Sequence, residues 1–355
     1  MFKEIFIDQY LNSERKVPLI DVRSPKEYDH AHIPGATHMP LFDDSERATV
    51  GITYKNEGQE KAILKGLELV SHKIVSFVEQ AKDIAENNSI VLHCWRGGMR
   101  SKSMATLFDF AGIKTEVIKG GYKSYRHNAK KVFAKAWNLI ILGGKTGSAK
   151  TKILQALENQ GEQIIDLEKL ANHKGSAFGD LGEETQPTTE MFENLLFEEL
   201  QKIDPAKRCW VEDESHLIGN IFIPEDFWTQ MRNAPVMYCD FPVDERIKFL
   251  VETYGSFEKE GVVNAVKKIT KRLGGENAKA ALEAYAEGNL LEATRIVLRY
   301  YDKTYSYGLS QRRQERICKI EMQKIKPEEN AKELVHQVKN ITAKNTEKTA
   351  QGISL

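Results

Sequence analysis

A cysteine followed by two glycines and two arginines is the feature of this sequence best suited to chemistry. It ends a short apolar run, and an amphipathic segment begins directly after it, in the order His93, Cys94, Trp95, Arg96, Gly97, Gly98, Met99, Arg100, Ser101. The pattern predicts a strand followed by a helix N-terminus, where loop N–H groups and guanidinium charge stabilise a thiolate. We therefore predict that Cys94 is the catalytic nucleophile. Arg96 and Arg100 complete the catalytic set, and Gly97 and Gly98 form the oxyanion-binding loop.

The spacing of Cys94 and Arg100 fits two kinds of reaction. In a C-x5-R loop the amides surround a phosphate-sized anion, and the arginine holds two of its oxygens. A phosphatase uses such a loop to attack phosphorus, whereas a sulfur or selenium transferase uses the cysteine to carry the chalcogen atom. A buried, inert cysteine is the third interpretation, and the flanking arginines argue against it.

A second motif, in the middle of the chain, is typical of phosphate binding. Gly144, four further residues and then Ala149, Lys150 and Thr151 match a P-loop, except that alanine stands where glycine usually precedes the lysine. Gly144 and Gly147 let backbone amides surround a phosphate. Lys150 neutralises its charge, and the Thr151 hydroxyl faces Mg²⁺. We expect a phosphate-bearing ligand here, bound at a loop in which Ala149 adds a Cβ at a tight position.

Carboxylates at the end of another apolar run are candidates for holding Mg²⁺ beside this loop. The run reads Cys209-Trp-Val211-Glu212-Asp213-Glu214-Ser215. Acidic residues at the end of a strand often hold the magnesium ion of a P-loop protein, directly or through water. Asp213 is the first candidate and Glu212 the second. An acidic turn after a strand would have the same sequence, so this pattern supports both interpretations.

Charge is unevenly distributed, although Lys plus Arg and Asp plus Glu both total 51. The stretch 114–135 holds seven basic residues and one acid, with aromatic residues between them. Such a stretch is typical of RNA contacts, because phosphates pair with cations and bases stack on rings. A solvated helix face would have the same composition, and charge alone does not separate the two. The candidate RNA contacts are Tyr122, Lys123, Tyr125, Arg126, Lys130 and Lys131.

The order of predicted elements indicates an α/β protein with two parallel-sheet domains. In the first, strands are expected at 18–22, 89–93 and 115–118, helices at 67–85 and 101–111, and an irregular excursion at 42–66. In the second, a basic helix at 129–137 precedes strands at 138–142, 163–167, 209–211, 235–239 and 316–320, with helices at 190–202, 243–254, 262–273 and 278–301. The predicted domains are 1–128 and 129–342, the second including the basic linker helix, followed by a flexible tail at 343–355.

Composition excludes several classes of protein. Hydrophobic residues make up 41% and charged residues 29% of the chain. No stretch approaches the ~20 apolar residues of a membrane span, and the first residues lack a signal-peptide core. The four cysteines, at positions 94, 209, 239 and 318, have neither metal-binding spacing nor a disulfide pattern. These features predict a cytoplasmic protein without membrane contact. They leave the oligomeric state open, and a monomer is compatible with them.

The first domain resembles the rhodanese family. The resemblance rests on the stretches 19–28 and 32–36 and on the Cys94 loop, and it covers about residues 5–125. It implies a rhodanese-like parallel-sheet fold. Cell-cycle phosphatases share that fold, so the chemistry stays open. Asp21 and Arg23 are expected to pin loops by charge-assisted hydrogen bonds rather than to react.

A rhodanese-like domain followed by a P-loop NTPase-like α/β domain with extra C-terminal helices is a rarer combination. Over nearly the whole chain it resembles the bacterial tRNA 2-selenouridine synthase family. Besides the Cys94 loop, the stretches that carry the resemblance are 41–55, 120–126, 144–151, 166–179 and 211–219. Ala149 departs from the family pattern, which usually has glycine there.

This resemblance implies a reaction on tRNA. The family replaces the sulfur of a wobble 2-thiouridine by selenium from selenophosphate, after the sulfur has been geranylated with geranyl diphosphate. Cys94 would then carry selenium as a selanyl-cysteine. The P-loop would hold the diphosphate of geranyl diphosphate or a nucleotide, with Mg²⁺ but no tightly bound cofactor. The implied partners are the anticodon stem-loop of tRNA and a supply of selenophosphate.

Three other functions are compatible with the residues. The first domain could be a C-x5-R phosphatase, or a rhodanese-type sulfurtransferase fused to a nucleotide-binding module. The chain could also be an RNA-binding scaffold without activity. The intact Cys94, Arg96 and Arg100 argue against the scaffold.

Overall fold

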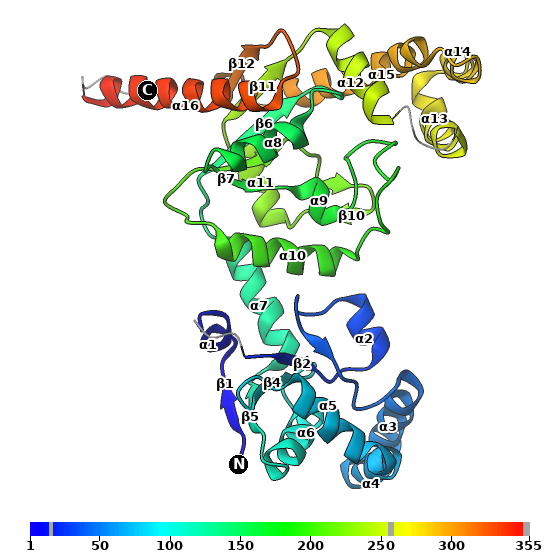
Figure 1. The fold of residues 1–355 in the computed structure, drawn as a ribbon, viewed down its shortest axis with the longest axis vertical. Coiled ribbons are helices and arrows are strands. Elements are labelled where there is room, and N and C mark those ends of the chain that lie inside the picture. The colour runs from blue at the N-terminus through cyan, green and yellow to red at the C-terminus, as the bar shows by residue number, and fades with distance from the viewer. Residues whose placement is uncertain (14–16, 255–258, 351–355) are drawn as a thin grey trace. The chain divides into compact units, whose positions relative to one another are not determined.

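The structure is a computed structural model, and it describes residues 1–13, 17–254 and 259–350 (Figure 1). The chain divides into two compact units. The first comprises Met1–Ala134 with the short segment Glu193–Glu198, and the second comprises Lys135–Phe192 with Glu199–Leu355. Each unit has its own five-stranded sheet. Along the described residues, no helix combines the length and the apolar character needed to span a membrane.

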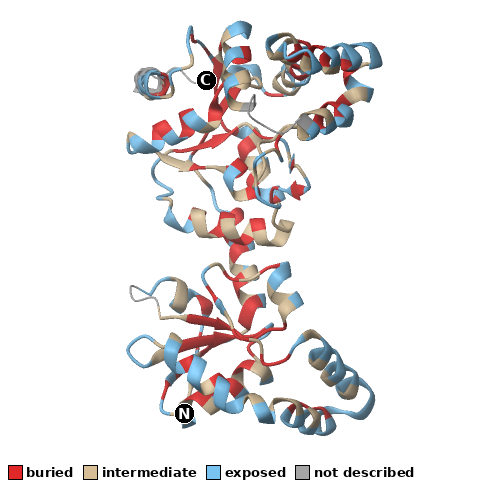
Figure 2. Cartoon of the chain, turned by 45° about the vertical axis from the view of Figure 1, so that its right-hand side comes forward, coloured by how far each residue is buried: buried red, intermediate tan, exposed pale blue. Residues whose placement is uncertain are grey.

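The sheet of the first unit is entirely parallel, in the order β1-β5-β4-β2-β3, so β4 is its middle strand. The strands are β1 (Lys3–Ile5), β2 (Leu19–Asp21), β3 (Thr37–His38), β4 (Ser89–His93) and β5 (Lys114–Ile118). The helices are α1 (Ile7–Leu11), α2 (Pro25–His30), α3 (Asp44–Glu57), α4 (Gln59–Val70), α5 (Ile74–Ile84), α6 (Met99–Phe110) and α7 (Gly121–Phe133). The strands near 18–22, 89–93 and 115–118 are confirmed, and they form the buried centre of this unit (Figure 2).

The stretch 42–66 is helical, so the prediction of an irregular excursion is wrong. Helices α3 (Asp44–Glu57) and α4 (Gln59–Val70) pack against each other. Asp43 and Glu46 form a capping box, with each side chain accepting the other's backbone N–H at 2.8 and 2.9 Å. Gly58, with φ of 92°, separates the helices. The sequence looked irregular because α3 has no buried residue and therefore no apolar stripe. The single helix expected at 67–85 is divided between α4 and α5 by the 3₁₀ turn Ser71–Lys73.

The basic helix expected at 129–137 is α7, which begins eight residues earlier than predicted, at Gly121 rather than Ala129. Its apolar positions recur at helical spacing and are buried, whereas its lysines lie on the other side. α7 belongs to the first unit, which extends to Ala134. The predicted boundary at residue 128 therefore falls inside a helix.

A fully buried ion pair joins Asp21, the last residue of β2, to Arg23. Arg23 Nε lies 2.9 Å from Asp21 Oδ2, and Arg23 Nη2 donates to Ala31 O at 2.7 Å. The Arg23 guanidinium lies 4.0 Å from the centre of the Tyr122 ring, and His93 Nε2 lies 3.6 Å from Asp21 Oδ2. The expected role of Asp21 and Arg23 in pinning loops is confirmed. Loss of either partner would leave an uncompensated buried charge.

The sheet of the second unit is also entirely parallel, in the order β12-β11-β6-β8-β7, with β6 in the middle. Its strands are β6 (Leu139–Gly144), β7 (Gln163–Ile165), β8 (Cys209–Glu212), β11 (Val236–Asp240) and β12 (Ile317–Glu321). All five agree with the prediction to within a few residues. A short antiparallel pair, β9 (Leu217–Ile218) and β10 (Ile221–Phe222), was not predicted, because two-residue strands leave no periodic signal.

Helices make up most of the rest of the second unit. They are α8 (Lys150–Asn159), α9 (Leu167–Ala171), α10 (Thr189–Lys202), α11 (Glu225–Asn233), α12 (Val243–Tyr254), α13 (Lys259–Leu273), α14 (Gly275–Ala286), α15 (Leu290–Ser310) and α16 (Pro327–Ala350). The segment Glu193–Glu198 of α10 groups with the first unit. The single helix expected at 278–301 is two helices, because the chain turns at Gly288 with φ of 80°.

The flexible tail expected at 343–355 stays a prediction, although the chain is helical over most of that stretch. α16 continues to Ala350, and residues 351–355 lie outside the described residues. No glycine or proline interrupts the stretch 328–350, so nothing in it opposes helix formation strongly.

His93 makes the stability of the first unit dependent on pH. Burial lowers the pKa of His93 below its ordinary 6.5, more than the charge of Asp21 raises it. Below pH 6.5 the unfolded chain therefore binds a proton that the folded chain excludes, so stability is complete above this pH and decreases as the pH falls. We predict a lower urea-unfolding free energy at pH 5.5 than at pH 7.5. The variant His93→Gln should flatten this dependence, and His72→Gln, at an exposed position, should retain it. Equal wild-type values at both pH values would contradict the prediction.

Candidate functional sites in the two units

Cys94 lies directly after β4, the middle strand of its sheet, and before α6. The side chain is buried, and Sγ accepts hydrogen bonds from Gly98 N and Ser101 Oγ, each at 3.3 Å. Gly98 is the N-cap of α6, so the sulfur also lies at the positive end of the helix dipole. These donors therefore hold Sγ at a point where the loop amides and the helix N-terminus can also bind an anion. Ser101 was not predicted as a site residue, and its contact with sulfur depends on the turn that opens α6.

The path of this loop depends on two glycines with positive φ. Gly97 has φ of 62°, and a Cβ there would lie 2.3 Å from Ile118 O. Gly121 has φ of 55°, and a Cβ there would lie 2.2 Å from Cys94 O. Because no side chain intervenes, Tyr122 N donates to Cys94 O at 2.9 Å. The start of α7 therefore holds the backbone of the cysteine loop in place.

The two predicted arginines have different surroundings. Arg100 Nη1 and Nη2 donate to the two carboxylate oxygens of Glu27 at 2.5 and 3.2 Å. Burial alone would raise the pKa of Glu27, but the pair with Arg100 lowers it below its ordinary value. Arg96 is exposed and, within the described chain, forms no ion pair. Arg96 is thus available to an anion, whereas Arg100 would first have to leave Glu27. This weakens the phosphatase interpretation, which needs Arg100 on the oxyanion.

The predicted P-loop lies between β6, the middle strand of its sheet, and α8. A Cβ on Gly144 would lie 2.4 Å from Ser148 Oγ, and the Ser148 hydroxyl donates to Lys145 O at 2.7 Å. Ala149 is the N-cap of α8 and has a left-handed backbone, with φ of 54° and ψ of 33°. That conformation is unfavourable by ~1–2 kcal/mol for a residue with a Cβ. The alanine therefore strains the position at which the loop turns into the helix.

Lys150 and Thr151 lie among buried carboxylates. Thr151 Oγ1 donates to Glu168 Oε2 at 2.7 Å, and Lys150 Nζ lies 5.4 Å from the centre of the Tyr305 ring. Burial alone would lower the pKa of Lys150, but Tyr305, Glu168 and Glu214 raise it, so the amine is charged at neutral pH. Burial, and then the charge of Glu168, raises the pKa of Glu214 well above its ordinary value. A buried cation beside an acid whose ionisation is opposed by burial suits the approach of a polyanion.

The two predicted magnesium ligands do not contact the P-loop threonine. Asp213 forms an ion pair with Arg312, and Glu212 Oε2 accepts from Leu167 N at 3.2 Å. Burial, and then the charge of Asp166, raises the pKa of Glu212 well above its ordinary value. In the described part of the chain, no three histidine, cysteine or carboxylate side chains form a metal-binding group. The carboxylate at the P-loop threonine is Glu168, which is thus a further candidate, and Asp213 and Glu212 stay predictions.

The segment 166–179 supplies site residues that sequence reasoning missed. Glu168 lies on α9, and a Cβ on Gly175 would lie 2.5 Å from Glu214 Oε2, so this glycine lets the segment approach the carboxylates. Ser176 and Phe178 line an apolar pocket beside the P-loop. One signal could have found Glu168. It follows β7, and the carboxyl ends of strands in a parallel sheet meet at one edge, where ligands bind.

Arg246 of α12 is a further missed residue. Its Nη1 donates to Thr146 O in the P-loop at 3.1 Å, and its two Nη atoms donate to Asp302 of α15 at 2.8 Å each. The side chain is almost fully buried. It thus links the phosphate loop to the C-terminal helices. No motif in the sequence marks this arginine, because the contact joins residues that are a hundred positions apart.

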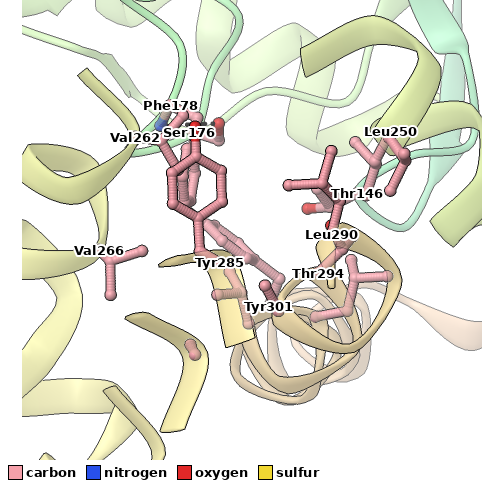
Figure 3. A pocket seen from close by; sticks show the side chains of 15 residues that line it. Thr146, Ser176, Phe178, Leu250, Val262, Val266, Tyr285, Leu290, Thr294 and Tyr301 are labelled. Carbon is pink, nitrogen blue, oxygen red and sulfur yellow. Dashed lines mark hydrogen bonds between the residues drawn. The ribbon is translucent and has the colours of Figure 1, made fainter. Parts of the chain in front are cut away.

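The apolar pocket opens beside the P-loop (Figure 3). Its empty space, open mouth included, is about 730 Å³, and its walls come from Thr146, the segment 176–178 and helices α12 to α15. The rings of Phe178, Tyr285 and Tyr301 and the side chain of Leu250 lie around this space (Figure 3). An anion-binding loop next to an apolar cavity suits a ligand with a charged head and a hydrocarbon tail.

Of the predicted RNA contacts on α7, some side chains are buried and others are exposed. Tyr122 and Tyr125 are 0% exposed, so neither ring offers a face to a base, and the expected stacking is not supported. Arg126 is partly buried and pairs with Glu193, within the same unit. The exposed members of the set are Lys123, Lys130 and Lys131. The aromatic positions recur at helical spacing because they pack the core, and this spacing alone could not be told from a stacking platform.

Comparisons with known proteins agree with both halves of the chain. Two family models match: the rhodanese-like domain over residues 7–128 and the tRNA 2-selenouridine synthase AAA domain over residues 137–334. A tRNA 2-selenouridine synthase from Bdellovibrio bacteriovorus is 38% identical over 266 residues, covering 71% of this chain and 68% of that protein. One from Sulfurovum sp. is 35% identical over 328 residues, covering 82% of this chain and 88% of that protein.

Among solved structures, a similar chain is the N-terminal domain of a protein from Clostridium difficile 630 described as ATP/GTP binding. It is 41% identical and covers 36% of this chain and 98% of that chain, with a TM-score of 0.34. A TM-score this low supports no argument about the fold.

Replacing Ala149 tests the strain in the P-loop. Glycine adopts left-handed backbone readily, so Ala149→Gly should raise the free energy of unfolding of the second unit by about 1 kcal/mol. Urea denaturation followed at the second unit measures it. The matched control is Ala280→Gly on α14, an exposed helical position, where glycine should lower stability by about 1 kcal/mol. Loss of stability in both variants would show that Ala149 is unstrained.

Proposed function

The chain belongs to the tRNA 2-selenouridine synthase family, and we propose that it replaces the sulfur of a wobble 2-thiouridine in tRNA by selenium from selenophosphate. The reaction has two stages, with one unit responsible for each. The second unit alkylates the sulfur with geranyl diphosphate, and the first unit exchanges the alkylated sulfur for selenium. Such a substrate would also place the protein in the bacterial cytoplasm, with selenophosphate supplied from outside the enzyme.

The alkylation stage uses the P-loop and the pocket beside it. The thiouridine sulfur attacks C1 of geranyl diphosphate, the new C–S bond replaces the C–O bond, diphosphate leaves, and the N3 proton of the base passes to the diphosphate or to water. Lys150 and the loop amides hold the diphosphate, while the apolar pocket receives the ten-carbon chain. The observation that carries this assignment is the apolar pocket, whose wall includes Thr146 of the P-loop. A nucleotide would instead need polar partners for its base and ribose.

Residues at the P-loop fit a divalent cation. Glu214 Oε1 is buried and has no hydrogen-bond partner among the described residues, and Thr151 Oγ1 lies 2.7 Å from Glu168 Oε2. Mg²⁺ usually takes one or two carboxylates together with substrate phosphates, so Thr151 and Glu168 are the residues that would hold it. When bound, the ion neutralises charge on the leaving diphosphate.

The selenium stage takes place at the Cys94 loop. Selenium of selenophosphate forms a bond to C2 of the base, the bond from C2 to the alkylated sulfur breaks, and geranylthiol leaves with a proton. Water then splits the Se–P bond, and phosphate is released. No oxidant or reductant is needed, because selenium enters and leaves at the selenide level. The amides around Cys94 and the exposed Arg96 suit the phosphoryl end of the donor. The selanyl form of Cys94 stays a prediction.

Single substitutions should separate the two stages in cells. In a bacterial strain that lacks its own enzyme, Cys94→Ser should accumulate S-geranyl-2-thiouridine, because Cys94 lies in the loop that serves the selenium stage alone. Lys150→Ala should leave 2-thiouridine, because diphosphate binding is abolished. We expect each stage to slow at least about a hundredfold. Mass spectrometry of tRNA nucleosides measures both.

Two variants control for the substitutions themselves. Cys318→Ser changes a cysteine of the second unit, and Lys152→Ala changes an exposed lysine two residues after Lys150. Both should yield normal 2-selenouridine. Detection of 2-selenouridine at wild-type levels in Cys94→Ser cells would refute the proposed function.

The exposed lysines of α7 should contribute to tRNA affinity by pairing with phosphates. Replacing Lys123, Lys130 and Lys131 together by alanine should weaken binding and reduce the slope of log K against log salt by about 2 to 3, roughly one for each lysine replaced. Filter binding of tRNA at several salt concentrations measures this. A variant with Lys26, Lys55 and Lys82 replaced removes the same charge from exposed positions elsewhere in this unit. Equal slopes for the two triple variants would show that α7 is only a solvated face.

A further inference from the structure

The first unit contains a second large apolar cavity, to which the two stages above assign no role. It is a groove among α3, α4, α5 and α6, and its empty space, open mouth included, is about 1010 Å³. Among the described residues that line it, Arg100 alone is charged. Helices α3 and α4, which form much of its wall, are the ones predicted to be irregular (Figure 1).

Apolar side chains of this groove are unusually exposed. Tyr54 and Leu67, which line it, are each 57% exposed, and Met99 is 52% exposed. Contiguous apolar surface of this kind is uncommon on a protein unless it binds something. The buried side of the groove is formed by Phe42 and Phe77, which belong to the core of the unit. The groove is therefore a fixed feature of the fold rather than a loose surface patch.

The groove is continuous with the Cys94 loop through the first turn of α6. Met99 and Arg100 line the groove, and they lie between Gly98 and Ser101, the two residues that donate to Cys94 Sγ. Arg100 is held at this point by its pair with Glu27. A substituent on a base that reacts at Cys94 can thus extend over the turn and into the groove.

We propose that this groove binds the ten-carbon chain of the S-geranyl-2-thiouridine during the selenium stage. The inference rests on the proposed function, because it takes the alkylated base as the substrate of the first unit. The bond to be broken joins C2 to the alkylated sulfur, so the hydrocarbon chain has to lie next to the reacting centre. Each buried methylene adds about a fourfold gain in affinity. An apolar groove beside the cysteine thereby selects the alkylated base over the unmodified one.

The chemistry of the lining favours this occupant over others. A phosphate or a nucleotide would need several cations or polar groups, and Arg100 already pairs with Glu27. An apolar helix of a partner protein, or a second copy of this chain, would fill a similar groove. Those occupants would not make selenation depend on the length of the substituent on sulfur, and this difference is the basis of the test.

The experiment measures selenation of synthetic anticodon stem-loops by the full chain with selenophosphate. The RNAs carry 2-thiouridine with an S-methyl, a five-carbon S-prenyl or an S-geranyl group. For the wild-type protein we expect KM to fall with each longer chain, at least tenfold from S-methyl to S-geranyl. Leu67→Asp should raise KM for the S-geranyl RNA at least tenfold and leave KM for the S-methyl RNA within twofold. Leu64→Asp is the matched control, since Leu64 is 59% exposed on the same helix and does not line the groove.

The outcomes separate this inference from the proposed function. If the wild-type chain does not selenate the S-geranyl RNA at all, the proposed function fails. If it selenates all three RNAs with equal KM, or if Leu67→Asp and Leu64→Asp behave alike, the groove inference is overturned and the proposed function stands. A shift in oligomeric state with no change in chain-length preference would also overturn it. The wild-type series does not depend on a variant folding, and Leu67→Ala offers a milder substitution with the same expected direction.

Discussion

The geometry of parallel sheets places both reactive loops. In each unit, the loop follows the middle strand of a five-stranded parallel sheet and opens a helix. The carboxyl end of such a strand and the N-terminus of the next helix together direct free N–H groups at one point. Cys94 Sγ uses these groups in the first unit, and Lys150 follows the corresponding turn in the second. The two folds differ, but each provides a site for negative charge.

Charge around the P-loop is arranged differently from charge around Cys94. The cysteine loop has one exposed cation, Arg96, and backbone donors, whereas the P-loop has a buried lysine surrounded by buried acids. The raised pKa of Glu212 and of Glu214 shows that burial opposes their ionisation. In the unfolded chain these acids would be charged at neutral pH, so their burial opposes folding there. The arrangement is costly for stability and is therefore expected at a functional site rather than in a structural core.

The sequence was sufficient for the strands, for Cys94 and for the P-loop, because each has a local signal. Runs of three to five mainly apolar residues marked the strands, and the glycine-rich spacing marked the P-loop. Where the signal was not local, prediction failed. Arg246 reaches the P-loop from α12, and no spacing in the chain reveals this contact, whereas Glu168 on α9 is marked only by its place after β7. The tyrosines of α7 show a different error. The neighbouring lysines suggested that Tyr122 and Tyr125 stack on RNA bases, but both rings are buried in the core.

An apolar cavity accompanies each of the two anion-binding loops, and this pairing bears on why a prenyl group should be used at all. The hydrocarbon chain does not react, so its burial helps catalysis only if it is kept while the C2 bond is broken. A cavity at the P-loop alone would bind the chain before transfer and release it afterwards. On the proposal above, the groove beside Cys94 would retain that binding energy in the second stage, where it would hold the alkylated base against the selenium donor. On this argument the ten-carbon group contributes binding energy in both stages as well as forming part of the leaving group, and its length is set by the cavities that receive it.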